Sequence, residues 1–221
     1  MRRISKNWTE YNESLPNSPV VQIMETEWAA PLKSFISGRN ISVLEIGCSN
    51  GRYLTNLGQI VESKELVGVD IIACKTPDSM HFVQADALKL PFMDGSFDFV
   101  YSMGVLEHFK QVDRERLIEE QSRVLRPGGI MMIIMPNCTI GSVRFAKTKF
   151  LDLFRDFHHV AFTPSQIREE MRRHQIQVLF ERFMGSSLHI GKYQSPGTKP
   201  SKGSRISSEE YAIIGKREGA I

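Results

Sequence analysis

The residues best suited to chemistry lie in a glycine-bearing turn, Glu45-Ile46-Gly47-Cys48-Ser49-Asn50-Gly51, directly after an apolar run. Because glycine has no Cβ, the backbone at Gly47 and Gly51 can turn sharply and a ligand can approach it closely. Open α/β sheets bind ligands at such a turn, at the carboxyl end of the first strand. The same turn could also be purely structural, so the residues that follow it decide its meaning.

Two acidic residues follow the turn, each at the end of a short apolar run. Asp70 ends Val67-Gly68-Val69-Asp70, and Asp86 lies in Gln84-Ala85-Asp86-Ala87. Asp70 could simply cap a helix, but at the end of a second strand it can accept hydrogen bonds from both ribose hydroxyls. Asp86 can accept from the exocyclic amino group of adenine. Together with the turn, the two acids predict an adenosine site.

The turn argues against a nicotinamide dinucleotide. A pyrophosphate on a helix N-terminus favours three glycines in the spacing G-x-G-x-x-G, whereas Ser49 stands at the second glycine position. Glu45 would repel a pyrophosphate but suits an ammonium or a sulfonium cation. The site is therefore expected to bind a cofactor with positive groups.

Two further segments, Ser96 to Phe109 and Leu125-Arg126-Pro127-Gly128-Gly129, complete a pattern of five. In this order and spacing they resemble the class I S-adenosylmethionine-dependent methyltransferases, and among them the methyltransferase type 11 family, over about residues 40 to 137. The resemblance implies an enzyme that uses S-adenosylmethionine and releases S-adenosylhomocysteine. It implies cofactor contacts from Glu45, Gly47, Cys48, Ser49, Gly51, Asp70, Ile71, Asp86, Ala87, Ser102, Met103 and Gly104.

The same resemblance implies a fold: a Rossmann-like, doubly wound α/β sheet of seven strands in the order 3-2-1-4-5-7-6, with strand 7 antiparallel. The sequence offers seven β-rich runs, at residues 41–46, 66–69, 81–84, 97–102, 129–135, 175–183 and 211–216. The first five are apolar without clean alternation, which is typical of strands covered on both faces. An apolar stripe from Val112 to Leu125 predicts a helix closed by Arg126–Gly129, and Thr163-Pro164 predicts the start of another.

We expect residues 39–221 to form the methyltransferase domain, with acceptor-side insertions at about 138–163 and 184–209. Residues 1–38 are expected to be a lead-in and a helix that covers the site.

His108, just past the fourth strand, is a tentative catalytic base, because histidine titrates near neutral pH and could deprotonate an acceptor. Alternatively, it packs under the sheet edge or faces solvent. His158-His159 could shape the acceptor pocket or lie at the surface. No metal site is expected, because further ligands are not apparent near them.

The composition is that of an ordinary globular protein, with 41% hydrophobic and 24% charged residues among 221. The longest apolar run, Ile130 to Met135, is too short to span a membrane, and no secretory leader follows Met1. Three widely spaced cysteines suggest reduced thiols. These features predict a cytoplasmic protein with no membrane partner.

A net charge of +3 does not favour nucleic acid as a partner. We therefore expect a small-molecule acceptor, methylated by in-line displacement. An RNA or protein methyltransferase is the alternative, supported by Arg172-Arg173 and a basic tail over residues 192–205. A non-catalytic cofactor-binding homologue is a third possibility.

Overall fold

A computed structural model describes residues 29–36, 40–136, 163–184 and 210–219. They form one seven-stranded sheet in the order β3-β2-β1-β4-β5-β7-β6, as predicted. Strands β1 to β5 are parallel, whereas β7 runs antiparallel to both β5 and β6. The strands are β1 (Ile41–Ile46), β2 (Ser63–Asp70), β3 (His81–Gln84), β4 (Phe97–Met103), β5 (Leu125–Pro136), β6 (Ile176–Met184) and β7 (Glu210–Arg217).

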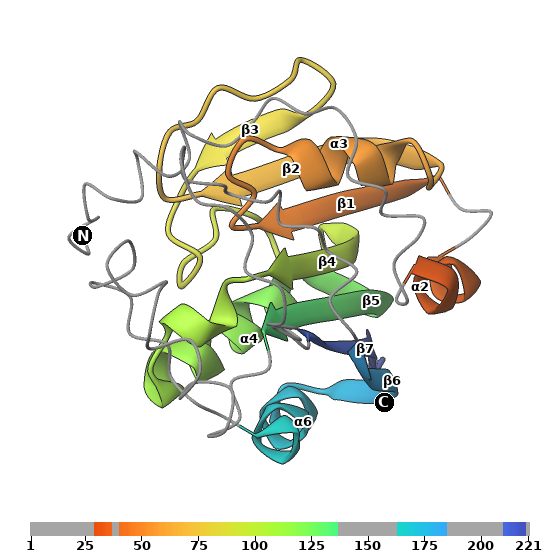
Figure 1. Ribbon diagram of the computed structural model, residues 1–221, viewed down its shortest axis with the longest axis vertical. Helices are drawn as coiled ribbons and strands as arrows, with labels where there is room; N and C mark the ends of the chain where they lie inside the picture. The colour runs from red at the N-terminus through yellow and green to blue at the C-terminus, as the bar shows by residue number, and fades with distance from the viewer. Residues whose placement is uncertain (1–28, 37–39, 137–162, 185–209, 220–221) are drawn as a thin grey trace, which may run out of the picture.

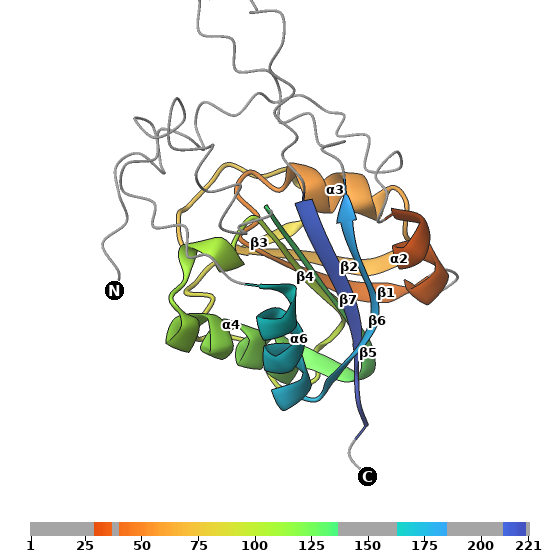
Figure 2. The same ribbon diagram turned by 60° about the horizontal axis from the view of Figure 1, so that its bottom comes forward.

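Helices cover both faces of the sheet (Figures 1 and 2). Helices α2 (Ala29–Ile36) and α3 (Arg52–Gly58) pack on one face, and α4 (Gln111–Val124) and α6 (Pro164–Arg173) on the other. All six residues of β1 are consequently buried, which fits a strand that is apolar except at Ser42 and Glu45. No helix in the described ranges is long and apolar enough to cross a membrane.

The carboxyl ends of the parallel strands meet at one end of the sheet, where the arrowheads of β1, β2, β4 and β5 point the same way in Figure 1. Strand β6 runs antiparallel to β7, which runs antiparallel to β5, so β6 ends there too. The chain beyond Pro136 and beyond Met184 thus leaves the sheet at the same end as the glycine turn. The two predicted insertions lie mostly outside the described residues, as do most of the lead-in, His158-His159 and the basic tail.

The structure departs from the sequence-based prediction around α4 and β5. Val112, which we placed in the apolar stripe, is 80% exposed, because it lies in the first turn of α4 on the side away from the sheet. The segment Arg126–Gly129 does not separate helix from strand, since β5 already begins at Leu125. A bulge in β5 accommodates it: Phe97 pairs with Leu125 and Phe99 with Ile130, and Gly128 has a φ of 75°.

Helix α6 begins as its sequence predicts. The Thr163 side chain accepts a hydrogen bond from the backbone N–H of Gln166, and the Gln166 side chain accepts one from Thr163 in return. Pro164 follows at the first helical position, where its missing N–H costs nothing.

Candidate functional site

The glycine turn is fixed against the end of β2. The backbone N–H groups of Gly47 and Cys48 both donate to the carbonyl of Val69, at 2.8 and 3.0 Å. Gly47 and Gly51 have φ values of 74° and 73°, and Ser49 one of 50°. Left-handed backbone costs a non-glycine residue roughly 1–2 kcal/mol, so the turn carries some strain at Ser49, where related motifs often have glycine.

Asp70 ties this turn to the loop after β2. One carboxylate oxygen accepts from the backbone N–H of Ser49 at 2.9 Å and the other from that of Ile72 at 3.0 Å. A carboxylate oxygen can accept more than one hydrogen bond, so each keeps capacity for a ligand hydroxyl. Asp70 thus orders the turn and still has capacity to bind a ribose. Ile71, between Asp70 and Ile72 in the sequence, is half-buried.

The segment that carries Asp86 lies beside Asp70. The backbone N–H of Ala85 donates to the carbonyl of Asp70 at 3.0 Å, which holds the chain after β3 against the end of β2. One oxygen of Asp86 accepts from the backbone N–H of Leu88 at 2.9 Å, and Asp86 and Ala87 are both half-buried. The turn and the two acids therefore converge at one edge of the sheet.

The chain after β4 closes the other side of the turn. Ser102 is fully buried and pairs in register with Ile46, and its hydroxyl makes no hydrogen bond to any described residue. Gly104, with a φ of 67°, donates its N–H to the carbonyl of Ile134 at 2.9 Å. A Cβ on Gly47 would lie 2.4 Å from a methyl carbon of Val105, so this wall touches the turn itself. Met103 is half-buried in the same wall.

Glu45 lies beneath the turn with 1% of its surface exposed. Burial raises the pKa of its carboxyl group to about 8, and the neighbouring Tyr101 hydroxyl offsets only part of that effect. Its Oε2 atom makes no hydrogen bond within the described part of the chain. A buried carboxyl group with an unused acceptor fits a cationic ligand group, which would restore the charged form.

Glu45→Gln is expected to stabilise the ligand-free protein relative to the parent, by an amount that increases as the pH rises. Glutamate ionises near pH 4.5 when unfolded, but Glu45 keeps its proton to about pH 8 when folded. Between about pH 4.5 and about pH 8 the native state binds more protons than the unfolded state. The free energy of unfolding of the parent therefore falls as the pH rises through this range, and it levels off at higher pH. The stability gap should widen by up to about 1.4 kcal/mol per pH unit. Urea unfolding of both proteins across this range measures the gap, and a pH-independent gap would contradict a protonated Glu45.

His108 ends the short helix η2 (Leu106–His108) at the same end of the sheet. Its side chain is 21% exposed, and its Nε2 atom lies 3.9 Å from the buried carboxylate of Glu107. The backbone N–H of His108 donates to the carbonyl of Val105, which touches the turn. The structure thus places His108 near the turn, and its role as a base stays a prediction.

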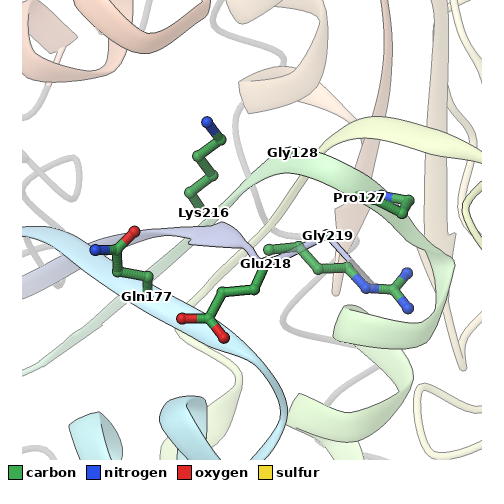
Figure 3. Close-up of a pocket in the computed structure, with 7 residues that line it drawn as sticks. Pro127, Gly128, Gln177, Lys216, Glu218 and Gly219 are labelled. Atoms are coloured by element: carbon green, nitrogen blue, oxygen red, sulfur yellow. The ribbon is translucent and has the colours of Figure 1, made fainter. Parts of the chain in front are cut away.

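No three His, Cys, Asp or Glu side chains gather as a metal site within the described ranges. A separate hollow lies at the opposite end of the sheet, at the starts of β5 and β6 and the end of β7 (Figure 3). It is lined by Pro127, Gly128, Gln177, Lys216, Arg217, Glu218 and Gly219. None of these belongs to the glycine turn or to the acids that surround it.

Two residues near the turn were missed in the sequence. Tyr101 adjoins Glu45 from β4, and Arg52 begins α3 directly after Gly51. Arg52 could have been noticed as a cation adjacent to the turn. The position of Tyr101 depends on the pairing of β1 with β4, which no local motif reveals.

A family model described as a methyltransferase domain matches residues 44–133, which run from β1 to β5 and include the turn and both acids. This stretch is a class I methyltransferase domain. The predicted fold and family are thereby confirmed, as is S-adenosylmethionine as the cofactor of the family.

The methyltransferase domain has relatives that act on tRNA. The tRNA (carboxymethyluridine(34)-5-O)-methyltransferase of Arabidopsis thaliana is 36% identical over 110 residues, 48% of this chain and 26% of that protein. The mouse tRNA (carboxymethyluridine(34)-5-O)-methyltransferase ALKBH8 is 32% identical over 135 residues, 56% of this chain and 18% of that protein. The matches thus span about a quarter or less of these relatives' own length.

Solved structures share the fold of the methyltransferase domain. The N-methyltransferase NodS from Bradyrhizobium japonicum, in complex with S-adenosylhomocysteine, superimposes with a TM-score of 0.60 at 14% identity. The comparison covers 96% of this chain and 99% of NodS.

The prediction about partners was wrong. We expected a small-molecule acceptor and gave nucleic acid only as the alternative, whereas these relatives methylate tRNA. Net charge averages over the whole chain and does not identify the surface that meets a substrate. Arg172 and Arg173, the basic pair noted in the sequence, both lie within 4 Å of the carboxylate of Glu169.

Proposed function

We propose that this protein transfers a methyl group from S-adenosylmethionine to an RNA of the tRNA class. The convergence of the glycine turn, Asp70 and the Asp86 segment at one sheet edge supports the cofactor half of this proposal. The tRNA methyltransferases among the relatives support the acceptor half.

In this proposal the chain holds the cofactor through the residues of the converging segments. Asp70 would accept from the ribose hydroxyls, and Asp86 with Ala87 would bind the adenine. Glu45 would accept from the ammonium group, for which its buried Oε2 atom is suited. The backbone of Gly47, Cys48, Ser49 and Gly51 would allow close approach, and Ser102, Met103 and Gly104 would line the methyl side.

When bound, the cofactor supplies a methyl group on a sulfonium, which is an already activated leaving group. The protein's part is then to position the acceptor in line with that methyl and to exclude water, which can contribute roughly 7–11 kcal/mol in favourable cases. His108 would take a proton from a hydroxyl or amine acceptor, or donate a hydrogen bond to an acceptor that is already ionised.

The acceptor contacts are proposed to come from residues 138–163 and 184–209. Strands β5 and β6 end at the same end of the sheet as the glycine turn, so both segments depart from the side where the methyl group would be presented. The second segment also contains the basic tail, which could contact phosphates.

Incubation of the protein with methyl-labelled S-adenosylmethionine and total tRNA should transfer label to the RNA. If the acceptor is a carboxylate, as in the two relatives named above, the product is a methyl ester and mild alkali releases the label as methanol. Raising the salt from about 50 to 200 mM should weaken RNA binding by about tenfold or more, because phosphate contacts release counterions. Affinity for S-adenosylhomocysteine, measured in parallel, should change far less. Absence of label in RNA, with cofactor binding intact, would overturn the acceptor half.

A further inference from the structure

Exposed lysines without a carboxylate partner lie on the three loops that follow β2, β3 and β4. They are Lys75, Lys89 and Lys110, one on each loop. Within the described ranges none of the three makes an ion pair, whereas most arginines there do. The charges of these lysines are therefore available to groups from outside the described part of the chain.

The loop after β2 stays at the end of the sheet that holds the glycine turn. At its start, the backbone N–H of Ile72 donates to the carboxylate of Asp70 at 3.0 Å. Further along, the loop meets the turn, because a Cβ on Gly51 would lie 3.6 Å from the Cδ atom of Pro77. Lys75 lies between these two anchors and is exposed. Its charge is thus held at the edge where the ribose would bind.

The other two lysines are held at the same edge by backbone hydrogen bonds. The N–H of Lys89 donates to the carbonyl of Asp86 at 2.9 Å, so Lys89 lies within one turn of the predicted adenine site. Lys110 comes two residues after His108, and its carbonyl accepts from the N–H of Arg114 at 2.8 Å, which starts α4. The three lysines therefore follow the cofactor edge from the adenine side to the predicted base.

The exposed charges differ between the two ends of the sheet. On the loops after β2, β3 and β4, one exposed acid makes no ion pair, Asp78, because Asp94 is paired with Arg123. At the opposite end, glutamates accompany each exposed lysine: Glu62 and Glu65 flank Lys64 at the start of β2, and Glu218 follows Lys216 at the end of β7. Positive charge thus predominates on the cofactor-edge loops, which the net charge of the whole chain does not reveal.

We infer that the loops after β2, β3 and β4 form an RNA-binding surface on which Lys75, Lys89 and Lys110 contact phosphates of the acceptor RNA. This inference rests on the proposed function and extends it. The RNA would cross the half of the sheet from β3 to β4, in addition to the segments that leave β5 and β6. Lysine binds phosphate as a point charge and does not read the base, so this surface would position the RNA and not select its sequence.

Filter binding of total tRNA to the full chain, at about 50–200 mM salt, tests the inference. Lys75→Ala, Lys89→Ala and Lys110→Ala should each weaken binding about 5- to 8-fold at about 0.1 M salt. Each should also reduce the slope of log affinity against log salt by about 0.7–0.9, because one phosphate contact fewer releases fewer counterions. The variants Lys75→Arg and Lys110→Arg retain the charge and should keep the parental slope. Affinity for S-adenosylhomocysteine should stay within about twofold in all of them.

Lys64→Ala combined with Lys216→Ala is the matched control, because it removes two exposed lysines at the opposite end of the sheet. Lys75→Ala combined with Lys110→Ala removes the same charge at the cofactor edge. This second pair should reduce the slope by about 1.4–1.8, and the control pair should leave it unchanged. Equal effects of the two pairs, or no effect of either, overturn the inference. A parent protein that binds no tRNA at any of these salt concentrations would instead contradict the proposed acceptor, and the inference would fall with it.

Discussion

Replacing Asp70 with alanine is expected to lower the affinity for S-adenosylhomocysteine by about 100-fold or more. The substitution would remove two charge-assisted hydrogen bonds to the ribose, each of about 1.5–3 kcal/mol. It would also free the backbone N–H groups of Ser49 and Ile72, which now donate to the two carboxylate oxygens. The turn would lose one of the contacts that fix its shape, so the affinity should fall for both reasons.

Thermal melting with and without ligand measures this effect. A saturating ligand raises the melting temperature of the parent by mass action, and the Asp70→Ala variant should lose most of that increase. Asp70→Asn retains one acceptor oxygen and should fall between the two. Asp78→Ala removes the same charge from an exposed position in the loop after β2 and should leave the increase unchanged. A folded Asp70→Ala variant with parental affinity would refute the assignment of the ribose site.

Removing Glu170 is expected to destabilise the fold by about 3–5 kcal/mol, independently of any ligand. Glu170 on α6 accepts two hydrogen bonds from Arg114 on α4, at 2.8 and 2.5 Å, and both side chains are 2% exposed. Glu170→Ala would leave the guanidinium of Arg114 buried without this counter-ion. Because the pair joins the two helices on one face of the sheet, its loss should loosen both (Figure 2).

Urea unfolding of three variants separates the cost of an unpaired charge from lost packing. Arg172→Ala, at an exposed position on α6, should change the free energy of unfolding by less than about 0.5 kcal/mol. The double variant Arg114→Met with Glu170→Leu should recover most of the loss, because apolar residues of similar size can replace a buried ion pair. A loss below about 1 kcal/mol for Glu170→Ala would mean that water or other groups compensate Arg114.

The strands could be predicted from the sequence because their signals are local, whereas their order in the sheet was implied by the family resemblance. Strand β1 coincides with the β-rich run from Ile41 to Ile46 and ends where Gly47 turns. The bulge at the start of β5 could not be predicted, because Arg126–Gly129 reads as a turn. Only the pairing with β4 shows that the same residues are absorbed into a strand.

The placement of the acids and glycines at one edge of the sheet could be predicted from the sequence, but the hydrogen bonds that connect them could not. Asp70 and Asp86 were found from their places at strand ends. That Asp70 also orders the turn depends on the contact between the β1 and β2 ends, which needs the three-dimensional fold. The acceptor could not be predicted from charge, because a net charge of +3 does not show where the charges lie on the surface.

A crystal structure of the full chain with S-adenosylhomocysteine would decide whether this edge of the sheet is the cofactor site. The ribose should lie on Asp70, the adenine beside Asp86 and the amino-acid end over Gly47. Clear ligand density in the hollow beside Lys216, or at any site away from the glycine turn, would contradict that assignment.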